Sequence, residues 1–547
     1  MIALTFQFVG GVGLFLLGMV LLTDGLKAFA GESLRRALVR FTGTPLKAFG
    51  SGALVTALVQ SSSATTVTVI GFVSAGLITF PQAIGVVMGA SLGTTGTGWI
   101  IAGLGLKISM AVYALPLVGL GAFMKLLASG RWRSLGLALA GFGLIFIGID
   151  TLQNAMRGLS GIFDLAGLPA GGLAGHALAM LIGIVMTVIM QSSSAAVATT
   201  LTALHTGAIN FEQAASLVIG AAVGTTITGA LAAIGANVPA KRTALAHVAF
   251  NLSTGLIAML LLPLFLGGIG LAQMHLGLDP GAVSLAAFHT AFIALGVAIF
   301  LPFADRFARV IERLLPDSGP TLTRHLDQTV LSTPAVALEA TRRALGETAA
   351  ETFAELRATL GVAVKDSGGG EARKAMLREA MDRLQEFFPH IPSVAADEPI
   401  SRLRVAQMHA IDHLSRLQTR LAPPPGVRRA LADPQLEAAT AQTRLILERA
   451  EAGLRGRGAP GWLAEVEQGA AELIELRRRE RPNILDRTAE GASAPGQALE
   501  LLDAMRWLDR LGYHAWRICR YLAGDGRHAP EPADVPEVAA LKMRGES

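Results

Sequence analysis

The feature that most constrains this chain is a stretch without any charged side chain, from Ala48 to Leu106. One helix of about 20 apolar residues crosses a hydrocarbon core of about 30 Å, so this stretch must hold several membrane segments. Apolar residues dominate the first 304 positions, and the composition becomes charge-rich after Pro302. Because 547 residues are also too many for one ordinary domain, we expect a membrane part followed by a soluble part.

The charge and the cysteine content exclude several other classes of protein. The formal net charge is +5, but much of the excess lies beside apolar segments, where Lys and Arg orient helices rather than bind a polyanion. Nucleic-acid binding is therefore not expected. The single cysteine, Cys519, excludes an internal disulfide framework and a cysteine-rich metal site. The chain begins on an apolar run without a basic region before it, which is typical of a retained helix.

The membrane part contains an internal repeat. The run Gln60-Ser61-Ser62-Ser63-Ala64 recurs as Gln191-Ser192-Ser193-Ser194-Ala195, and Gly93-Thr94-Thr95 recurs as Gly224-Thr225-Thr226. Both offsets are 131 residues (191 − 60 and 224 − 93), so the blocks align without a gap. Between positions 60–98 and 191–229, 19 of 39 aligned residues are identical, which indicates duplication.

Each serine run lies in a segment of unusual length. As one helix, Leu46 to Thr79 would be about 50 Å long, too long for one crossing and too short for two crossings with a turn. We therefore expect re-entrant helical hairpins at about 46–80 and 173–208. Non-helical backbone at membrane depth is tolerated only where protein or a water-filled cavity surrounds it. The polar tips should therefore face a site rather than lipid.

The remaining apolar segments predict three crossings per repeat and a seventh helix after them. A unit with an odd number of crossings is inverted when it is repeated, so the two hairpins should enter from opposite sides, as in many secondary transporters. The expected crossings are 6–26, 82–101, 106–128, 134–155, 213–236, 243–267 and 283–304.

The positive charges agree with this topology. By the positive-inside rule, the N-terminus lies outside and everything after Ala304 lies in the cytoplasm. Only Lys107 and Arg157 fall on the outer side. The basic residues on the cytoplasmic side are Lys27, Arg35, Arg36, Arg40, Lys47, Lys125, Arg131, Arg133, Lys241, Arg242, Arg306, Arg309 and Arg313.

The serine runs have the chemistry of an ion site. Free backbone N–H groups and the positive end of a helix dipole favour an oxyanion such as phosphate, and hydroxyl groups add further donors. The same hydroxyl oxygens, with unwound carbonyls, can coordinate sodium. No Lys or Arg lies near either run, so cations would have to offset the charge of a bound dianion. Cation coupling is therefore expected.

Two other interpretations of these residues stay open. Ser, Thr and small residues are common where membrane helices pack closely, as at Gly89, Gly93, Gly220 and Gly224. A nucleophilic serine would need an oriented base; His205 follows the second run, but Ser74 holds the equivalent place in the first. The repeated placement favours a site over packing, and enzymatic activity is not expected.

The paired motifs resemble those of the type II sodium/phosphate cotransporters and their bacterial relatives, over roughly residues 5–304. The resemblance implies an all-α polytopic membrane protein with two inverted repeats, each with a re-entrant hairpin, that works by alternating access. It also implies the residues of the phosphate site, which are Gln60, Ser61, Ser62, Ser63, Gln191, Ser192, Ser193 and Ser194, with Thr94, Thr95, Thr225 and Thr226 close by. The residues expected to bind sodium are Ser62, Thr65, Ser91, Ser193 and Asn251.

Some positions depart from the family pattern or extend it. Ser91 and Ala222 stand where the family usually has Asn in Gly-Ala-Asn-x-Gly-Thr, and Ala222 offers no side-chain oxygen, which leaves the number of sodium sites open. His247 and Asn251 match the family's His-x-x-Phe-Asn pattern, and Phe288-His289-Thr290 resembles the start of a related one. For both histidines, helix packing and a functional role stay open.

The charge-rich remainder carries helical periodicity, for example at Leu338, Leu345 and Phe353. Helices are expected at 335–361, 371–388, 399–421, 433–455, 460–479 and 495–523, between breaks that contain Gly or Pro. Their number, behind such a transporter, resembles the PhoU-like domain of phosphate regulation. The expected domains are 1–133 and 134–304 for the membrane repeats, 305–334 for a linker, 335–525 for the helical domain and 526–547 for a flexible tail.

PhoU proteins carry acidic metal-binding clusters, and Glu347, Glu351 and Glu355 have the corresponding spacing of four residues. Such acids are also common on solvated helix faces, and we favour that interpretation here, as we do for Arg477-Arg478-Arg479. No metal or organic cofactor is expected.

Together these features predict a sodium-coupled phosphate transporter of the bacterial inner membrane with a cytoplasmic regulatory domain. A phosphate exporter with weak or no sodium coupling, and a phosphate-sensing signalling protein, stay open as alternatives. The expected partners are phosphate, sodium as the coupling ion, the lipid bilayer, and either a second copy of the chain or a cytoplasmic regulatory protein.

Overall fold

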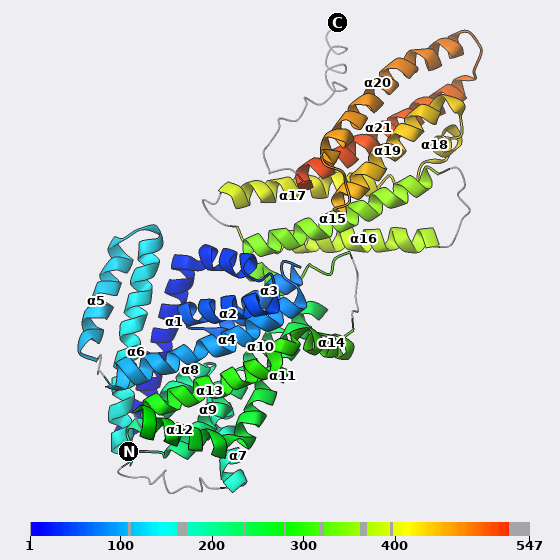
Figure 1. Cartoon of the computed structure of the whole chain (residues 1–547). Coiled ribbons are helices and arrows are strands. Elements are labelled where there is room, and N and C mark those ends of the chain that lie inside the picture. Colours follow the sequence, from blue (N-terminus) through cyan, green and yellow to red (C-terminus); the bar gives the residue numbers. More distant parts are fainter. Residues whose placement is uncertain are drawn as a thin grey trace. The chain divides into compact units, whose positions relative to one another are not determined.

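The computed structural model describes residues 2–107, 111–160, 172–234, 236–277, 281–316, 322–361, 369–393 and 398–523; the expected tail, 526–547, lies outside these ranges. Every regular element within them is a helix, which confirms the all-α class (Figure 1). The chain divides into two compact units, Met1–Ser318 and Gly319–Ser547, and each is described by itself.

Seven described helices of the first unit are long and apolar enough to cross a membrane. This confirms a multi-pass membrane protein. The stretches are Ile2–Ala30, Phe80–Leu106, Gly130–Gly158, Gly172–Met190, Phe211–Ala232, Val238–Leu260 and Ala282–Leu314.

This set of seven differs from the expected one in two places. A crossing was expected at 106–128, but α5 covers Ala111–Leu127, and its 17 residues are too few for it to be counted among the seven. In contrast, α7 (Gly172–Met190), expected as one arm of a hairpin, is long enough for a full crossing. Re-entry of the second hairpin therefore stays a prediction.

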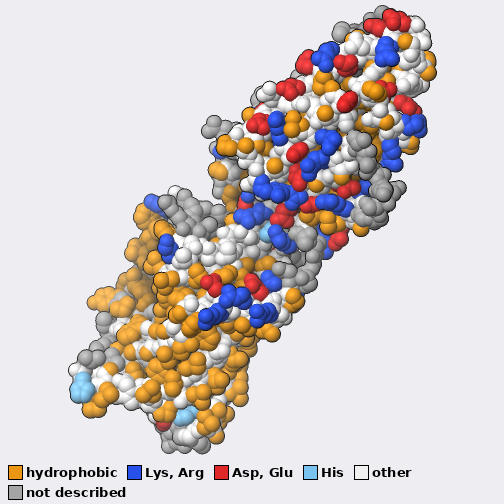
Figure 2. All heavy atoms as spheres, turned by 45° about the vertical axis from the view of Figure 1, so that its right-hand side comes forward, with side chains coloured by type: hydrophobic (Ala, Val, Ile, Leu, Met, Phe, Trp, Pro, Cys, Tyr) orange, Lys and Arg blue, Asp and Glu red, His pale blue; other side chains and the backbone are white. Residues whose placement is uncertain are grey.

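The surface of the first unit carries large apolar side chains, as a lipid-facing surface must. Phe6, Leu126 and Leu264 are 72%, 79% and 72% exposed. Figure 2 shows hydrophobic side chains over much of the visible face of this unit, whereas basic and acidic side chains are interspersed on the second unit.

Each serine run lies between two helices. The first run joins α2 (Pro45–Val59) to α3 (Ser62–Ser74), and the second joins α7 to α8 (Ser193–His205). A further helix then packs back on the first arm, α4 (Phe80–Ile100) on α2 and α9 (Phe211–Gly224) on α7. The sequence repeat thus corresponds to a three-helix unit that occurs twice. The opposite insertion of the two copies stays a prediction.

Equivalent residues form the turns of both copies. Gly76 (φ 70°) follows α3 and Gly207 (φ 75°) follows α8, in a left-handed conformation that glycine adopts without steric cost. Thr79 and Asn210 then begin the third helices. The backbone amide of each donates to the side chain of the Gln three residues later (2.8 and 2.9 Å), which forms a capping box.

Glycine allows the first arm to pack directly on the third helix. Gly89 lies on the carbonyl of Phe49 and Gly220 lies on the carbonyl of Met180, so a Cβ at either glycine would overlap that carbonyl. Gly93 and Gly224 lie against α2 and α7 in the same way. The packing interpretation of these glycines is confirmed, and close helix contact is what holds such pairs together in lipid.

The remaining long pair in this unit is α1 (Ile2–Arg40) and α6 (Gly130–Ser160). Glycines also form this contact: Gly18 of α1 faces Gly141, and Gly11 faces Gly148. Because the glycines are spaced by seven residues on both helices, they fall on one face of each, and the two backbones approach closely along most of their length.

Two crossings are broken where single helices were expected. In 213–236, α9 ends at Gly224 and α10 covers Thr226–Ala232, because Thr225 and Thr226 donate their hydroxyls to carbonyls three residues earlier (2.6 and 2.8 Å) and disturb the helix. In 243–267, α11 (Val238–Leu260) gives way to α12 (Leu262–Leu276), because Pro263 lacks the N–H that would continue the helix. Conversely, α4 continues through a π-helical turn, Ile101–Lys107.

Two helices join the copies. α11 packs on α3, α4 and α9, and α13 (Ala282–Phe300) packs on α4, α8, α9 and α11, around the buried Phe250, Phe288 and Phe292.

The expected linker, 305–334, is largely structured. Its first part is α14 (Ala304–Leu314), which buries Ala308 in the first unit, and a 3-10 turn (Gln328–Ser332) follows in the second.

The second unit is a helical bundle around buried residues such as Phe353, Leu414, Leu447 and Leu508. Five of its six long helices begin and end near the expected residues. α20 extends ten residues beyond the predicted end (489 − 479), because Ile484 is buried beyond Pro482 and its packing outweighs the hydrogen bond that proline removes. The helices are α15 (Pro334–Thr359), α16 (Gly369–Phe387), α17 (Glu398–Gln418), the short α18 (Pro425–Ala430), α19 (Glu437–Leu454), α20 (Trp462–Ala489) and α21 (Pro495–Ala523).

Candidate functional site

The first helix break lies at Gln60, which ends α2 in the left-handed conformation (φ 59°). Its side chain is buried, and its amide donates to the carbonyl of Ala57. Ser61 begins α3, and its hydroxyl accepts a hydrogen bond from the amide of Ala64 (3.3 Å). The amides of Ser62 and Ser63 lie in the first turn of α3, where a helix supplies no acceptor of its own. They are therefore available to a ligand.

The second break repeats this geometry. Gln191 ends α7 with a φ of 51°, and the Ser192 hydroxyl caps α8 by accepting from the amide of Ala195 (3.2 Å). Ser193 and Ser194 follow and are buried. Among the described residues other than glycine, only Gln60 and Gln191 have a positive φ. This conformation costs about 1–2 kcal/mol per residue and is retained mainly where function requires it, which favours a site at both breaks.

Thr97 of α4 joins the two breaks. Its hydroxyl donates to the side-chain carbonyl of Gln60 (2.9 Å) and lies 3.5 Å from the hydroxyl of Ser194. All three side chains are buried. The structure therefore brings the two serine runs to one place inside the first unit, although they are 131 residues apart in sequence.

The electrostatics of this place are those of helix ends rather than of charged side chains. The N-termini of α3 and α8 each carry the equivalent of about half a positive charge. Along α3, α4 and α8 there is no Asp, Glu, Lys or Arg. An anion there would meet N–H and O–H donors without a fixed positive side chain on these helices, so a dianion would need cations as well.

Thr97 was not among the residues predicted from the sequence, although a signal for it exists. The internal repeat extends past Gly-Thr-Thr to a further Thr-Gly pair, Thr97-Gly98 in the first copy and Thr228-Gly229 in the second. The repeat marks the position, but only the fold shows that Thr97 reaches both breaks.

The predicted threonines are less central than the serine runs. Thr94, Thr95, Thr225 and Thr226 each donate to a backbone carbonyl three or four residues earlier, at 2.6–3.0 Å. Thr95 also accepts from the hydroxyl of Thr290 (3.1 Å), which links α4 to α13. Among the residues that the structure describes, no hydrogen bond joins these four threonines to the serine runs, so their role in a site stays a prediction.

Of the expected sodium residues, the structure brings together one pair. The hydroxyl of Ser91 lies 3.4 Å from the side-chain oxygen of Asn251, which is buried in α11. Thr65 instead accepts from Thr56 (2.9 Å). Ser62 and Ser193 remain beside their own helix breaks, and Ala222 contributes no oxygen.

The two histidines of the family-like patterns are buried in the first unit. The Nδ1 atoms of His247 and His289 have no hydrogen-bond partner among the described residues. His247 packs on Gly229, where a Cβ would lie 2.8 Å from Nδ1, and His289 stacks on Phe292 (5.5 Å). Both therefore take part in packing, and the structure assigns them no ligand.

A serine-hydrolase interpretation lacks its base. His205 is exposed at the C-terminal end of α8, whereas Ser193 and Ser194 lie at the N-terminal end. A helix of 13 residues separates those ends by about 18 Å. No hydrogen bond can join them.

The acidic residues of α15 are engaged by arginines and a histidine. Glu347 pairs with Arg324 (3.1 Å) and His325 (3.4 Å), and Glu351 pairs with Arg373 (2.6 Å). Burial raises the pKa of both glutamates, but hydrogen bonds and charges from these partners outweigh burial and lower it overall. No group of His, Cys, Asp and Glu in the described residues could hold a metal ion. Glu347 and Glu351 therefore do not merely lie on a solvated helix face, as expected from the sequence, but also form ion pairs.

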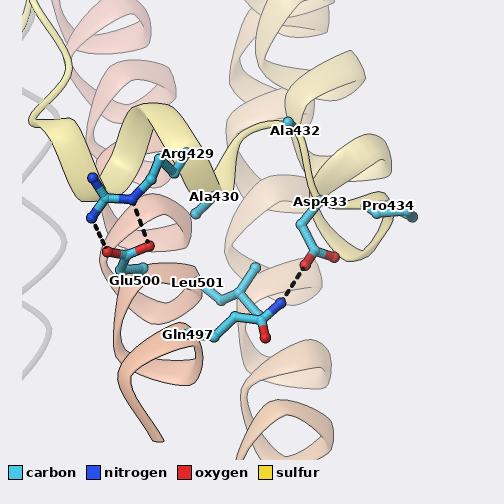
Figure 3. Close-up of a pocket in the computed structure, with 8 residues that line it drawn as sticks. All are labelled: Arg429, Ala430, Ala432, Asp433, Pro434, Gln497, Glu500 and Leu501. Atoms are coloured by element: carbon cyan, nitrogen blue, oxygen red, sulfur yellow. Dashed lines mark hydrogen bonds and ion pairs between the residues drawn. The ribbon is translucent and has the colours of Figure 1, made fainter. Parts of the chain in front are cut away.

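Arg477 of the Arg477-Arg478-Arg479 run and one cavity of the second unit also consist of paired polar groups. Arg477 bonds Asp509 (2.6 Å). One cavity of about 360 Å³ is lined by the Arg429–Glu500 pair and by Gln497, which donates to Asp433 (3.2 Å; Figure 3). These groups satisfy one another, so the cavity offers no unpaired group to a ligand.

Comparison with known proteins adds a separate line of argument. The family model described as "Na+/Pi-cotransporter" matches residues 14–154 and 171–314. The uncharacterized protein YqeW of Bacillus subtilis is 35% identical over 304 residues, 55% of this chain and 95% of YqeW. The putative inorganic phosphate export protein YjbB of Escherichia coli is 31% identical over 331 residues, 60% of this chain and 59% of YjbB.

A rat protein matches a shorter part. The sodium-dependent phosphate transport protein 2C of Rattus norvegicus is 38% identical over 109 residues, 19% of this chain and 18% of that protein. No solved structure matches the chain.

Proposed function

Because this chain belongs to the Na+/Pi-cotransporter family, we propose that it moves inorganic phosphate across a membrane by alternating access. The observation that carries the proposal is the meeting of the two serine runs at Thr97. The residues proposed to line the phosphate path are Gln60, Ser61, Ser62, Ser63, Thr94, Thr95, Gln191, Ser192, Ser193, Ser194, Thr225 and Thr226.

The two copies of the three-helix unit would supply the movement. In transporters with internal repeats, one repeat moves against the other around a fixed site near the bilayer midplane. Here the hydroxyl of Thr97 lies where the two copies meet, between Gln60 of the first copy and Ser194 of the second. Separating Thr97 from Ser194 would open the site toward one side.

Sodium is the proposed coupling ion. A phosphate dianion between two helix N-termini needs charge compensation, and α3, α4 and α8 carry no Lys or Arg. The rat relative is sodium-dependent by name. The proposed sodium ligands are Ser62, Thr65, Ser91, Ser193 and Asn251, among which Ser91 and Asn251 already approach each other.

Export with weak or no sodium coupling is the second candidate. Two observations favour it: the YjbB relatives are named as putative exporters, and Ala222 removes a side-chain oxygen at a position where the family usually has Asn. The transport site would be the same, because a transporter runs in the direction that its gradients set.

We further propose how the chain is organised in the cell. The membrane repeats are taken as 1–133 and 134–304, in a bacterial inner membrane, with the helical domain, 335–525, in the cytoplasm as a PhoU-like regulatory module. The positive-inside distribution supports this orientation. A second copy of the chain or a cytoplasmic protein would be the regulatory partner, and no enzymatic step is proposed.

Phosphate flux in vesicles tests the transport proposal. Purified chain in liposomes should take up radiolabelled phosphate faster with an inward sodium gradient, and the double variant Ser62→Ala/Ser193→Ala should abolish this stimulation. Thr151→Val is the matched control, since Thr151 bonds only the backbone of its own helix. Efflux that ignores sodium would favour export. If no flux occurs in either direction, the transport proposal is wrong.

A further inference from the structure

The contact between α17 and α21 in the second unit contains two buried histidines. Nδ1 of His413 and Nδ1 of His514 are 2.9 Å apart, and the His409 ring stacks on Tyr521 with centroids 4.9 Å apart. Since a later residue of α17 lies beside an earlier residue of α21, the two helices run antiparallel. Arg420, just beyond the end of α17, and Arg510, one turn before His514, therefore come to the same end of this contact.

Positive charge at this end is not balanced. Arg416 pairs with Asp412 (3.1 Å). Arg420 donates to the carbonyl of Arg416 (2.6 Å), and within the ranges that the structure describes no carboxylate pairs with Arg420 or Arg510. Burial, and after it the guanidinium groups of Arg510 and Arg416, lower the pKa of Arg420. Asp509, next to Arg510 on α21, adds a second carboxylate, but it bonds Arg477 (2.6 Å). The antiparallel register of α17 and α21 thus brings Arg416, Arg420 and Arg510 to one end of the contact, where four guanidinium groups share two carboxylates.

From this arrangement we propose that Arg416, Arg420 and Arg510 form a binding site for a phosphate-bearing anion, separate from the transport site. Guanidinium groups donate pairs of parallel hydrogen bonds that fit phosphate oxygens, and hydrogen bonds between two charged groups are among the strongest in proteins. A bound anion would also remove the repulsion that Arg420 experiences. The source of the phosphate group is free orthophosphate or the headgroup of an anionic lipid, and the proposal holds whether or not the chain transports phosphate.

The pKa of the buried His514 should depend on whether an anion occupies the site. Burial, then His413, and then Arg420 and Arg510 lower the pKa of His514 to about 3. Arg416 and Arg517 also face the pair, while Asp412 is the acid that opposes them. An anion on Arg420 and Arg510 would offset their charge, so the pKa of His514 should rise when the site is filled.

Hydrogen exchange on the full chain tests the site. The full chain is placed in nanodiscs of neutral phosphatidylcholine, and orthophosphate is added at ten times its Kd. Amide exchange in α17 and α21 should then slow about tenfold for those amides that exchange only when the site opens and the anion dissociates. The variant Arg420→Gln/Arg510→Gln should lose this protection. Arg506→Gln is the matched control, because Arg506 lies one turn earlier on α21 and pairs with its own carboxylate, Asp503.

A second arm separates the two sources of phosphate and the two sites. Nanodiscs with phosphatidylglycerol and no free phosphate should protect the same peptides if the ligand is a headgroup. The variant Gln60→Ala/Ser194→Ala, which alters only the transport site, should keep the protection. Exchange of the His514 ring C2 hydrogen gives an independent measure of its pKa. Protection that survives Arg420→Gln/Arg510→Gln, or an absence of protection with both ligands, would overturn the proposal.

Discussion

Gln60 and Gln191 share a backbone conformation, but their side chains have different surroundings. The carbonyl of Gln60 accepts a hydrogen bond from Thr97, and the side chain is 7% exposed. Gln191 is exposed and donates to the carbonyl of Val188 (2.7 Å). The glutamine of one break is therefore covered and bonded to Thr97, whereas the glutamine of the other is exposed, an asymmetry that a protein with two alternating states would exchange between its repeats.

Thr97→Val tests the residue that joins the breaks. Valine fills the same space but cannot donate to Gln60, and a buried unpaired acceptor costs about 1–3 kcal/mol. We expect phosphate flux in liposomes to fall at least about fivefold, since that cost corresponds to about 5–150-fold in an equilibrium. Thr97→Ser, which keeps the hydroxyl, should retain most of the flux. Equal flux in the two variants would remove Thr97 from the site.

The left-handed glutamines allow stability to be separated from function. Glycine adopts a positive φ without the steric cost of a side chain, and this gain offsets the loss of the buried hydrogen bond between Gln60 and Thr97, so Gln60→Gly should change thermal stability little while it removes the amide. We expect Gln60→Gly to lose phosphate flux, measured beside its unfolding temperature in detergent. Gln191→Gly should lose less flux, because the exposed side chain of Gln191 donates only to the carbonyl of Val188. A Gln60→Gly chain with normal flux would show that the side chain has no role.

At this scale the repetition and the chemistry of the residues predicted a candidate site. Serine runs without nearby charge indicated helix N-termini as anion ligands, and both runs do lie at helix N-termini, with Ser61 and Ser192 as the caps. The contact of Thr97 with both runs depends on how α4 crosses α8, and no local pattern encodes that crossing. The different burial of Gln60 and Gln191 was unpredictable for the same reason, since their neighbouring sequences are alike.

The helices of the first unit are held together by backbone contacts at glycines. Gly89 and Gly220 occupy equivalent positions of the repeat and face the carbonyls of Phe49 and Met180. Two elements that pack in this way can move as one body, because no long side chain between them can change its rotamer. The paired helices α2–α4 and α7–α9 are therefore suited to rigid-body movement.

Gly89→Ala and Gly220→Ala test these contacts. Each added methyl group would overlap a backbone carbonyl, so the helix pair must separate, at a cost of about 1–3 kcal/mol or more. We expect lower unfolding temperatures in detergent and poor expression for both variants. Gly119→Ala is the matched control, because a Cβ there meets nothing within 4 Å. A wild-type unfolding temperature for Gly89→Ala would contradict the close contact of α2 with α4.

Hydropathy and periodicity predicted where helices occur, and the segment lengths predicted the breaks at the serine runs, but the breaks within 213–236 and 243–267 were not predicted. The long helices of the second unit lie where apolar spacing placed them, since each buries one stripe of side chains. The break at Thr225 arises from hydroxyl groups that compete for backbone carbonyls, and the equivalent Thr94 leaves α4 intact. Thr94 donates its hydroxyl to the carbonyl four residues earlier (3.0 Å), whereas Thr225 donates to the carbonyl three residues earlier (2.6 Å), so the same residue types gave different outcomes in the two copies.

The α17–α21 contact should be sensitive to acid. Burial, and then the charge of Arg517, lower the pKa of His413 to about 4, while a histidine in an unfolded chain titrates near 6.5. Between these values the unfolded chain binds more protons, so the stability is fully present above about pH 6.5 and falls as the pH falls toward 4. Amide exchange in α17 and α21, corrected for intrinsic rates, should therefore be faster at pH 5 than at pH 7.5. His413→Asn should reduce this difference between the two pH values. His390→Gln is the control and should not reduce it, because His390 is exposed. Equal protection at both pH values would contradict a neutral, buried pair of His413 and His514.

On the scale of the whole molecule, the two units have different relations to known proteins. The family model ends at residue 314, and the match to YqeW covers 95% of that protein, so YqeW is in essence a relative of the first unit. The division of the structure falls just beyond, between Ser318 and Gly319. All the described helices that are long and apolar enough to span a membrane lie before that division.

We therefore expect a chain that ends at Ser318 to insert into membranes and to carry phosphate by itself. It keeps both helix breaks, Thr97, and α14, whose end is held by a hydrogen bond from Arg242 to the carbonyl of Leu315 (2.8 Å). A truncation at Leu301 is the matched control, since it removes α14 and exposes the buried side chain of Arg242. The initial flux of the Ser318 chain in liposomes should lie within about threefold of the full chain, while any response to phosphate on the cytoplasmic side should disappear. Loss of all flux at normal folding would mean that the second unit takes part in transport and does not only regulate it.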